Sequence, residues 1–309
     1  MILKVVDKWL LVFTVLLLLL ILILPQILAY SNTLFLIIIG LVGIPHGALD
    51  HVIHFRNKSV SKMHTFNFYA RYIALILVVC CCWYFFPLTT FGLFMAISAY
   101  HFGQSQLFYV KGPGVVRHVI FTLWGVFVLS SIIALNYHEG LAIIASLEWL
   151  NADEWMSVGL WTIIASASGL VLMAGFLYLW VHRHFTKQKL LFELFLLACL
   201  VLFSTFSNAV FTFSVYFGLW HSLRSLFIEY QSLNLAIKGY SLRNFLLNIF
   251  PFSFLAIIFL VISYYLAPYL WNDLSPYMLF IMFVSALTVP HLFIMHDLYE
   301  NDQIKLQKS

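Results

Sequence analysis

Long apolar runs alternate with short polar breaks along almost the whole chain. Ten runs of roughly 18 to 26 residues are long enough to cross the hydrocarbon core of a bilayer as helices. They lie at 9–29, 33–55, 66–86, 88–110, 116–136, 157–181, 189–206, 208–230, 245–267 and 276–298. The pattern predicts an all-α, polytopic transmembrane helical bundle that occupies residues 1–309 as a single integral-membrane domain.

The basic residues give the predicted bundle a direction. All 16 lysines and arginines lie before the first span, in or near the loops that follow even-numbered spans, or after the last span. Loops that follow odd-numbered spans carry none. Because basic residues gather on the cytoplasmic side of membrane proteins, we predict that both termini are cytoplasmic and that the chain is a multi-pass protein of the cell (inner) membrane.

Composition agrees with this prediction and excludes a large soluble domain. Hydrophobic residues make up 63% of the 309 residues and charged residues 9%, whereas a compact soluble domain needs a polar surface. The four cysteines lie in apolar segments, three of them adjacent, and form no CxxC pattern. Neighbouring helical residues point apart, so we predict apolar packing rather than disulfides or a zinc site.

The longest loop on the predicted outer side, residues 136–155, combines four acidic residues with an apolar run from Leu141 to Leu150. This composition is typical of a helix that lies on the membrane surface. Its role stays open between a cap on the bundle and a gate for a lipid-soluble substrate.

Four histidines share one depth in the predicted membrane. His46, His101 and His221 each lie 13 residues beyond the outer start of their span, and His291 lies 15 residues beyond its own. At about 1.5 Å per residue, all four lie roughly 20 Å below the outer surface. Their four helices run in the same direction, so we predict that the imidazoles converge.

Two of these histidines belong to a repeated pattern, PHxxxxH, at 45–51 and 290–296. Five residues turn a helix by about 500°, so the two histidines of a pair cannot share a face. We favour His46 and His291 as the inward members, with His51 and His296 as the next candidates.

Small and polar residues accompany the histidines. Four glycines flank them, and small residues let helix backbones approach closely. These are Gly43, Gly47, Gly103 and Gly218. A second polar layer, one turn nearer the cytoplasm, contains Asp50, Gln104 and Arg224. Asp50 follows His46 by four residues, so we expect its carboxylate to accept a hydrogen bond from that ring, as partners of metal-bound histidines commonly do.

Ionisable side chains inside a bilayer are functional candidates by default. We therefore predict a metal ion held by His46, His101, His221 and His291, while structural hydrogen bonding between helices and a proton or ion path remain open. An all-imidazole set suits iron, copper or zinc better than magnesium or calcium. A site buried in lipid has little water, which favours oxidation of an apolar molecule over hydrolysis. Aromatic residues beside the histidines are the candidate lining of a substrate tunnel. They are Tyr100, Phe102, Tyr216, Phe217 and Trp220.

Four motifs in order along nearly the whole chain carry a family resemblance. IPHGALDH (44–51), YHFGQ (100–104), LWHSLRS (219–225) and VPH (289–291) resemble the signatures of the Brp/Blh family of membrane β-carotene 15,15′-dioxygenases. The resemblance implies that O2 cleaves the central double bond of β-carotene at a histidine-held Fe(II) and gives two all-trans-retinal. It also implies no catalytic residue beyond the metal centre, and a hand-off of retinal to a microbial rhodopsin.

The chain departs from the family pattern at two places. Members often carry an acidic residue shortly after HFG, where this chain has Gln104, Ser105 and Gln106, and many have a histidine one turn after WHS, where it has Ser225. If that histidine is a ligand in relatives, the fourth ligand here lies elsewhere. The depth argument selects His291 as this fourth ligand. The next alternative is that His51 takes the place of His46.

Two other functions compete with this interpretation. A histidine-based proton-coupled membrane transporter needs no bound metal. Another lipid-oxidising membrane metalloenzyme, of the desaturase or hydroxylase class, needs about eight ligands in several HxxH-type clusters, and the chain has a single HxxH, at 51–54. A retinal carrier is disfavoured because the predicted spans contain no lysine except Lys189, at the cytoplasmic end of its span.

Overall fold

The computed structural model describes residues 2–58, 61–146, 152, 156–270 and 274–308, and within these ranges the chain is helical with short connections and no strand. The first half contains α1 (Ile2–Ile23), the 3₁₀ turn η1 (Pro25–Tyr30), α2 (Ser31–Ile38), the π-helical η2 (Ile39–Gly43), α3 (Ile44–Gly47), α4 (Asp50–Phe55), α5 (Lys62–Phe85), α6 (Pro87–Leu107), α7 (Gly114–Leu135) and α8 (Tyr137–Ala145). The second half contains α10 (Val158–Val181), α11 (Lys187–Phe206), α12 (Ala209–Val215), the π-helical η4 (Tyr216–Leu223), α13 (Arg224–Ala236), α14 (Leu242–Leu270) and α15 (Pro276–Lys308).

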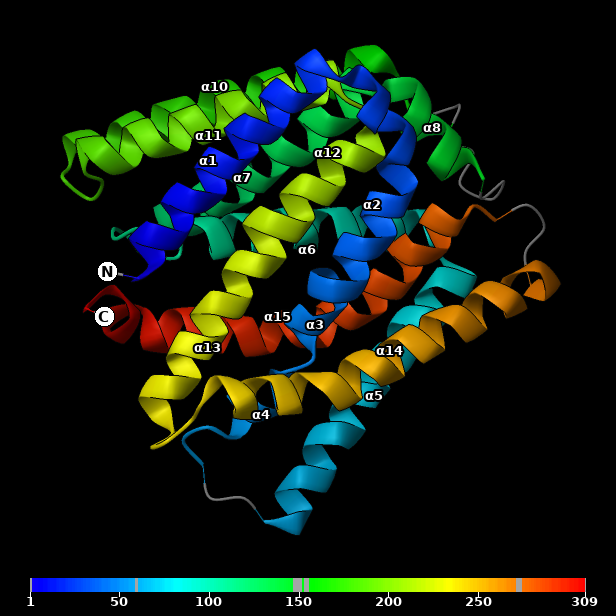
Figure 1. The fold of residues 1–309 in the computed structure, drawn as a ribbon, viewed down its shortest axis with the longest axis vertical. Helices are drawn as coiled ribbons and strands as arrows, with labels where there is room; N and C mark the ends of the chain where they lie inside the picture. Colours follow the sequence, from blue (N-terminus) through cyan, green and yellow to red (C-terminus); the bar gives the residue numbers. More distant parts are fainter. Residues whose placement is uncertain (1, 59–60, 147–151, 153–155, 271–273, 309) are drawn as a thin grey trace.

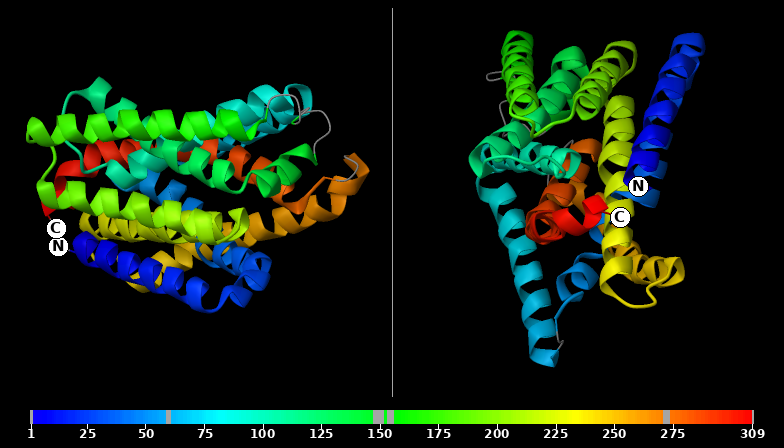
Figure 2. Two further views of the ribbon diagram at one scale, coloured as in Figure 1. Left: turned by 90° about the horizontal axis from the view of Figure 1, so that it is seen from above. Right: turned by 90° about the vertical axis from the view of Figure 1, so that its left-hand side faces the viewer.

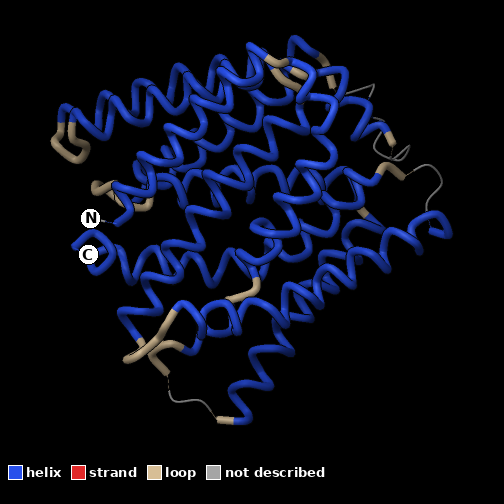
Figure 3. Tube along the Cα trace, in the orientation of Figure 1, coloured by secondary structure: helices blue, strands red, loops and turns tan. Residues whose placement is uncertain are grey.

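The helices pack as a bundle. Helices α7, α10 and α11 form one side, α5 and α14 the other, and α6 and α15 lie between them (Figures 1 and 2). The start of α1 and the end of α15 lie side by side at one end of the bundle. The loops at 108–113, 182–186 and 237–241 gather at that same end (Figure 3).

Eight helices of the described chain are long and apolar enough to cross a membrane, which agrees with a multi-pass membrane protein. Two of the ten expected spans, 88–110 and 208–230, are not among these eight. Both are nevertheless helical, as α6 and as the continuous stretch from α12 to α13. Their lower hydropathy has a physical cause, because these two segments carry many of the buried polar side chains of the interior.

Helix α8 covers the first half of the loop for which we expected a surface helix. Its Glu139 carboxylate accepts a hydrogen bond from Ala209 N at the start of α12, at 2.7 Å, and the carbonyl of Ile143 accepts one from Ser275, at 3.3 Å. These bonds connect α8 to the ends of two neighbouring helices, as a cap would. Residues 147–151 and 153–155 of the expected helix lie outside the described residues.

Glycines permit the closest helix crossings in the interior. A Cβ on Gly218 of η4 would overlap the side chain of Ile38, and one on Gly103 of α6 would overlap the carbonyl of Phe121 on α7. A Cβ on Gly43 would press on the Phe217 ring. The expectation for Gly47 was wrong, because a Cβ there would meet no neighbour within 4 Å.

We predict that Gly103→Ala destabilises the bundle by about 1–3 kcal/mol or more. The new methyl group would overlap the backbone of Phe121, which cannot move aside as a side chain can. The matched control is Gly92→Ala in the same helix, where a Cβ meets nothing within 4 Å. Unfolding in mixed micelles, followed by circular dichroism, measures both. Equal stability of the two variants would contradict the close approach of α6 and α7.

Candidate metal centre

Four imidazoles meet inside the bundle. His46 comes from α3, His101 from α6, His221 from η4 and His291 from α15, and none is more than 5% exposed. Ring-centroid separations are 4.5 Å for His46–His291, 4.9 Å for His101–His221, 5.0 Å for His46–His221, 5.3 Å for His101–His291 and 6.4 Å for His46–His101. The structure thus brings together the four histidines that the depth argument selected.

Local irregularities in two helices position their rings. His46 lies between the π-helical η2 and a break at Ala48–Leu49, where α3 ends and α4 begins. His221 lies within the π-helical η4. Short π-helical insertions are common at functional sites, because the extra residue in a turn re-aims the side chains that follow.

The break before α4 also changes the partner of Asp50. We expected Asp50 to accept a hydrogen bond from His46 on a continuous helix, and this expectation was wrong because the two residues lie on different helices. Asp50 Oδ1 instead lies 2.7 Å from His291 Nδ1, and Asp50 Oδ2 accepts a hydrogen bond from the Tyr72 hydroxyl at 2.8 Å.

The partner of His46 is a residue that sequence reasoning missed. Glu229 of α13 is 0% exposed, and its Oε1 lies 2.6 Å from His46 Nδ1. A signal was available, because Glu229 is a carboxylate inside an expected span, eight residues (about two helical turns) after His221.

His221 has a neutral partner. Its Nδ1 lies 3.1 Å from Ser105 Oγ, which donates its proton to the Phe102 carbonyl at 3.0 Å and so accepts from the ring. Arg224 supports this arrangement indirectly. Its Nη1 donates to the Ser105 carbonyl at 2.6 Å and its Nε to Asp7 Oδ1 at 2.7 Å.

These partners turn the Nε2 atoms of His46 and His291 toward each other. An ionised carboxylate only accepts hydrogen bonds, so Nδ1 of His46 and of His291 donates and each Nε2 keeps its lone pair. The two Nε2 atoms lie 2.9 Å apart. Two lone pairs at this distance need a shared positive charge, either a proton on one of the rings or a metal ion beside both.

The ring of His101 also favours a metal site. Both nitrogens of His101 are buried and have no hydrogen-bond partner among the described residues. Ring nitrogens of His46, His101 and His291 all lie within 4.8 Å of one another. Nitrogens that bind one ion at about 2.1 Å and at right angles lie about 3 Å apart, so the residues present fit a transition-metal ion.

The second histidine of each PHxxxxH pair faces another way. The His51 ring packs on Phe252 of α14, 4.4 Å between centroids. His296 Nδ1 lies 3.0 Å from Gln104 Nε2 and 3.5 Å from the Tyr100 hydroxyl, which also bonds His118. Gln104 and Tyr100 therefore belong to a polar cluster of their own and make no hydrogen bond to the four imidazoles.

A comparison with protein-family models identifies the relatives of the chain. The model described as beta-carotene 15,15′-dioxygenase matches residues 37–299, a range that includes all four histidines. The chain belongs to the β-carotene 15,15′-dioxygenase family. Comparison with curated proteins and with solved structures returned no match. Membership confirms the resemblance seen in the motifs and supports a carotenoid-cleaving dioxygenase as the class of enzyme.

For a dioxygenase of this family, the aromatic residues near the imidazoles are candidate walls for the substrate. Phe102 and Phe217 lie 4.6 and 5.4 Å from the His221 ring, and Tyr216 packs behind Phe102 at 5.4 Å. Trp220 faces elsewhere, since its indole donates to Thr14 Oγ1 at 3.0 Å.

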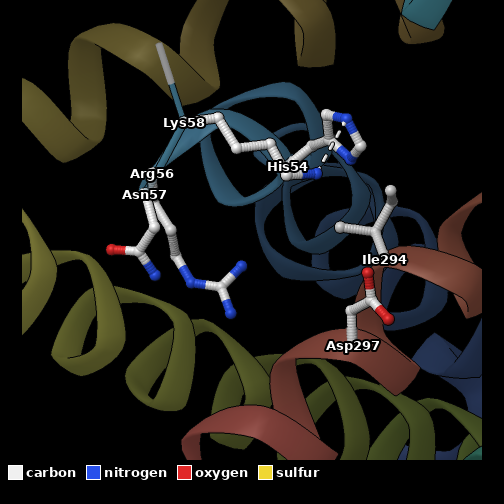
Figure 4. A pocket seen from close by; sticks show the side chains of 6 residues that line it. All are labelled: His54, Arg56, Asn57, Lys58, Ile294 and Asp297. Atoms are coloured by element: carbon white, nitrogen blue, oxygen red, sulfur yellow. Dashed lines mark hydrogen bonds between the residues drawn. The ribbon is translucent and has the colours of Figure 1, made fainter.

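A separate pocket of about 180 Å³ opens where α4 ends beside α15 (Figure 4). Lys58 Nζ and His54 Nε2 lie 3.3 Å apart on its wall. It is lined by His54, Arg56, Asn57, Lys58, Ile294 and Asp297. Because five of its six lining residues carry polar or charged groups and none of the four imidazoles is among them, the pocket does not suit the apolar substrate of the dioxygenase family.

The geometry predicts that His291→Ala lowers the transition-metal content of the purified dioxygenase by roughly tenfold or more, because it removes one of the inward Nε2 atoms. The matched control is His296→Ala, which lies in the same helix and the same motif but bonds Gln104. Elemental analysis of both variants measures the difference. Normal metal content in His291→Ala, or an equal loss in His296→Ala, would exclude this ligand.

Proposed function

We propose that the chain is an Fe(II)-dependent dioxygenase that cleaves the central 15,15′ double bond of β-carotene with O2 and releases two all-trans-retinal. The observation that carries the proposal is the convergence of four buried imidazoles inside an apolar helical bundle. Neutral nitrogen ligands suit iron, and the family of the chain supports β-carotene as the substrate.

The proposed reaction balances without further reactants. The central carbon–carbon double bond breaks, and each of its two carbons receives one oxygen atom of O2 as an aldehyde. When bound, Fe(II) would activate dioxygen, which reacts slowly with closed-shell polyenes. No proton is gained or lost, so the reaction needs no protein acid or base.

The residues of the chain hold the reactants in place. Hydrogen bonds to Asp50, Ser105 and the other partner described above set the tautomers of the histidine rings. One nitrogen of each ring then stays free to bind the ion. Phe102 and Phe217, beside His221, offer flat apolar faces on which a conjugated polyene can pack. Buried surroundings exclude water from the reacting double bond.

We also propose ten membrane spans, both termini in the cytoplasm and residence in the cell (inner) membrane. The side-by-side position of the two ends of the chain supports an even number of crossings (Figure 2). Retinal is apolar and would leave into the bilayer, where a microbial rhodopsin is the receiver that the resemblance implies.

Expression in β-carotene-producing cells is expected to remove the carotenoid and to yield about two retinal molecules per β-carotene lost, since cleavage is central. The matched inactive variant is His101→Ala, which removes the ring whose nitrogens have no hydrogen-bond partner among the described residues. Pigment extraction and chromatography quantify both molecules. Longer apocarotenals in place of retinal would contradict central cleavage, and persistence of β-carotene beside well-expressed, iron-supplied protein would contradict the function.

The topology makes its own prediction. A fluorescent protein fused after residue 309 is expected to fluoresce, since its fusion point lies in the cytoplasm, whereas a phosphatase that works only outside the cytoplasm should be active when inserted at residues 207–208. The reverse pattern of the two reporters would overturn the proposed orientation.

A further inference from the structure

Among the described residues, no lysine or arginine pairs with the two carboxylates beside the imidazoles. Asp50 and Glu229 are 3% and 0% exposed, and their ionic partners in the described part of the chain are the rings of His291 and His46 alone. The buried Arg224 of α13 is already paired with Asp7 at 2.7 Å. The cluster therefore combines four imidazoles with two buried carboxyl groups.

Glu229 is the less satisfied of the two carboxylates. Both oxygens of Asp50 have partners, His291 and Tyr72. Glu229 Oε1 meets His46, but Oε2 is buried without a hydrogen-bond partner among the described residues. An ionised carboxylate in such a position is costly unless positive charge lies close by.

Position and charge together suggest a role for this residue that the motifs did not indicate. We propose that Glu229 is a positioning residue of the metal centre. Its carboxylate holds His46 in the tautomer whose Nε2 faces the other rings and, with Asp50, supplies the two negative charges that match a divalent cation. This proposal rests on the proposed function, because it assumes that the four histidines bind a metal ion.

A substitution that separates charge from hydrogen bonding tests the proposal. In Glu229→Gln the amide oxygen can still accept a hydrogen bond from His46 Nδ1, but one negative charge is lost. In Glu229→Leu both the charge and the acceptor are lost. The control is Glu193→Gln, which neutralises another carboxylate that is 0% exposed but bonds Gln106 and Tyr109 of its own cluster.

The probe is Co(II), which substitutes for Fe(II) and reports its ligand geometry through visible absorption bands. We expect Glu229→Gln to weaken Co(II) binding by about 10- to 100-fold, with bands close to those of the wild type because the four rings remain. Glu229→Leu should weaken binding further and shift the bands, because the His46 ring loses its orientation. Glu193→Gln should bind Co(II) as the wild type does.

Thermal unfolding of the metal-free protein separates this role from a merely structural one. An uncompensated buried charge destabilises the metal-free state, so metal-free Glu229→Gln should unfold at or above the wild-type temperature and gain less from added Co(II). A lower unfolding temperature together with unchanged Co(II) affinity would assign Glu229 a structural role and overturn the proposal.

The failures of the two proposals look different. Wild-type protein that binds neither Co(II) nor Fe(II) would refute the metal-dependent function and this role with it. Wild-type protein that binds Co(II) and makes retinal, beside a Glu229→Gln variant of equal affinity, would refute the role of Glu229 alone.

Discussion

The interior of this bundle has to accommodate imidazole nitrogens that point at one another. Nε2 of His46 and Nε2 of His291 lie 2.9 Å apart while each ring already uses Nδ1 for a carboxylate. Two neutral rings in these tautomers would set lone pair against lone pair, so the contact needs a proton on one ring or a metal ion beside both. The nitrogens of His101 are buried without a hydrogen-bond partner in the described part of the chain, so this ring has a nitrogen free to bind an ion. A metal ion held by the four rings accounts for both observations.

Several features of the surrounding fold are needed to bring four imidazoles together. Short side chains reach a common point only if their helices approach closely, and glycines at 103 and 218 allow this where a methyl group would overlap a neighbour. Rings that must aim inward need irregular backbone, which η2, η4 and the break at Ala48–Leu49 provide. Buried carboxylates from α4 and α13 then orient two of the rings.

Periodicity and motifs predicted the helical class, the positions of most helices and the four histidines that meet. They also predicted that only one histidine of each PHxxxxH pair turns inward, since five residues place the second ring on another face. What they could not supply were contacts between distant helices. Asp50 pairs with His291 because the helix breaks after Gly47, and Glu229 reaches His46 across the bundle. Neither contact can be predicted from the spacing of residues along one helix.

The central claim is that one iron ion lies among four histidines in a dioxygenase of the β-carotene 15,15′-dioxygenase family. Diffraction from crystals of the iron-loaded protein, measured on both sides of the iron absorption edge, tests it most directly. The account predicts one anomalous peak at about 2.1 Å from Nε2 of His46, His101, His221 and His291. A peak held by other residues, such as His118 and His296, or no peak in protein that makes retinal, would contradict it.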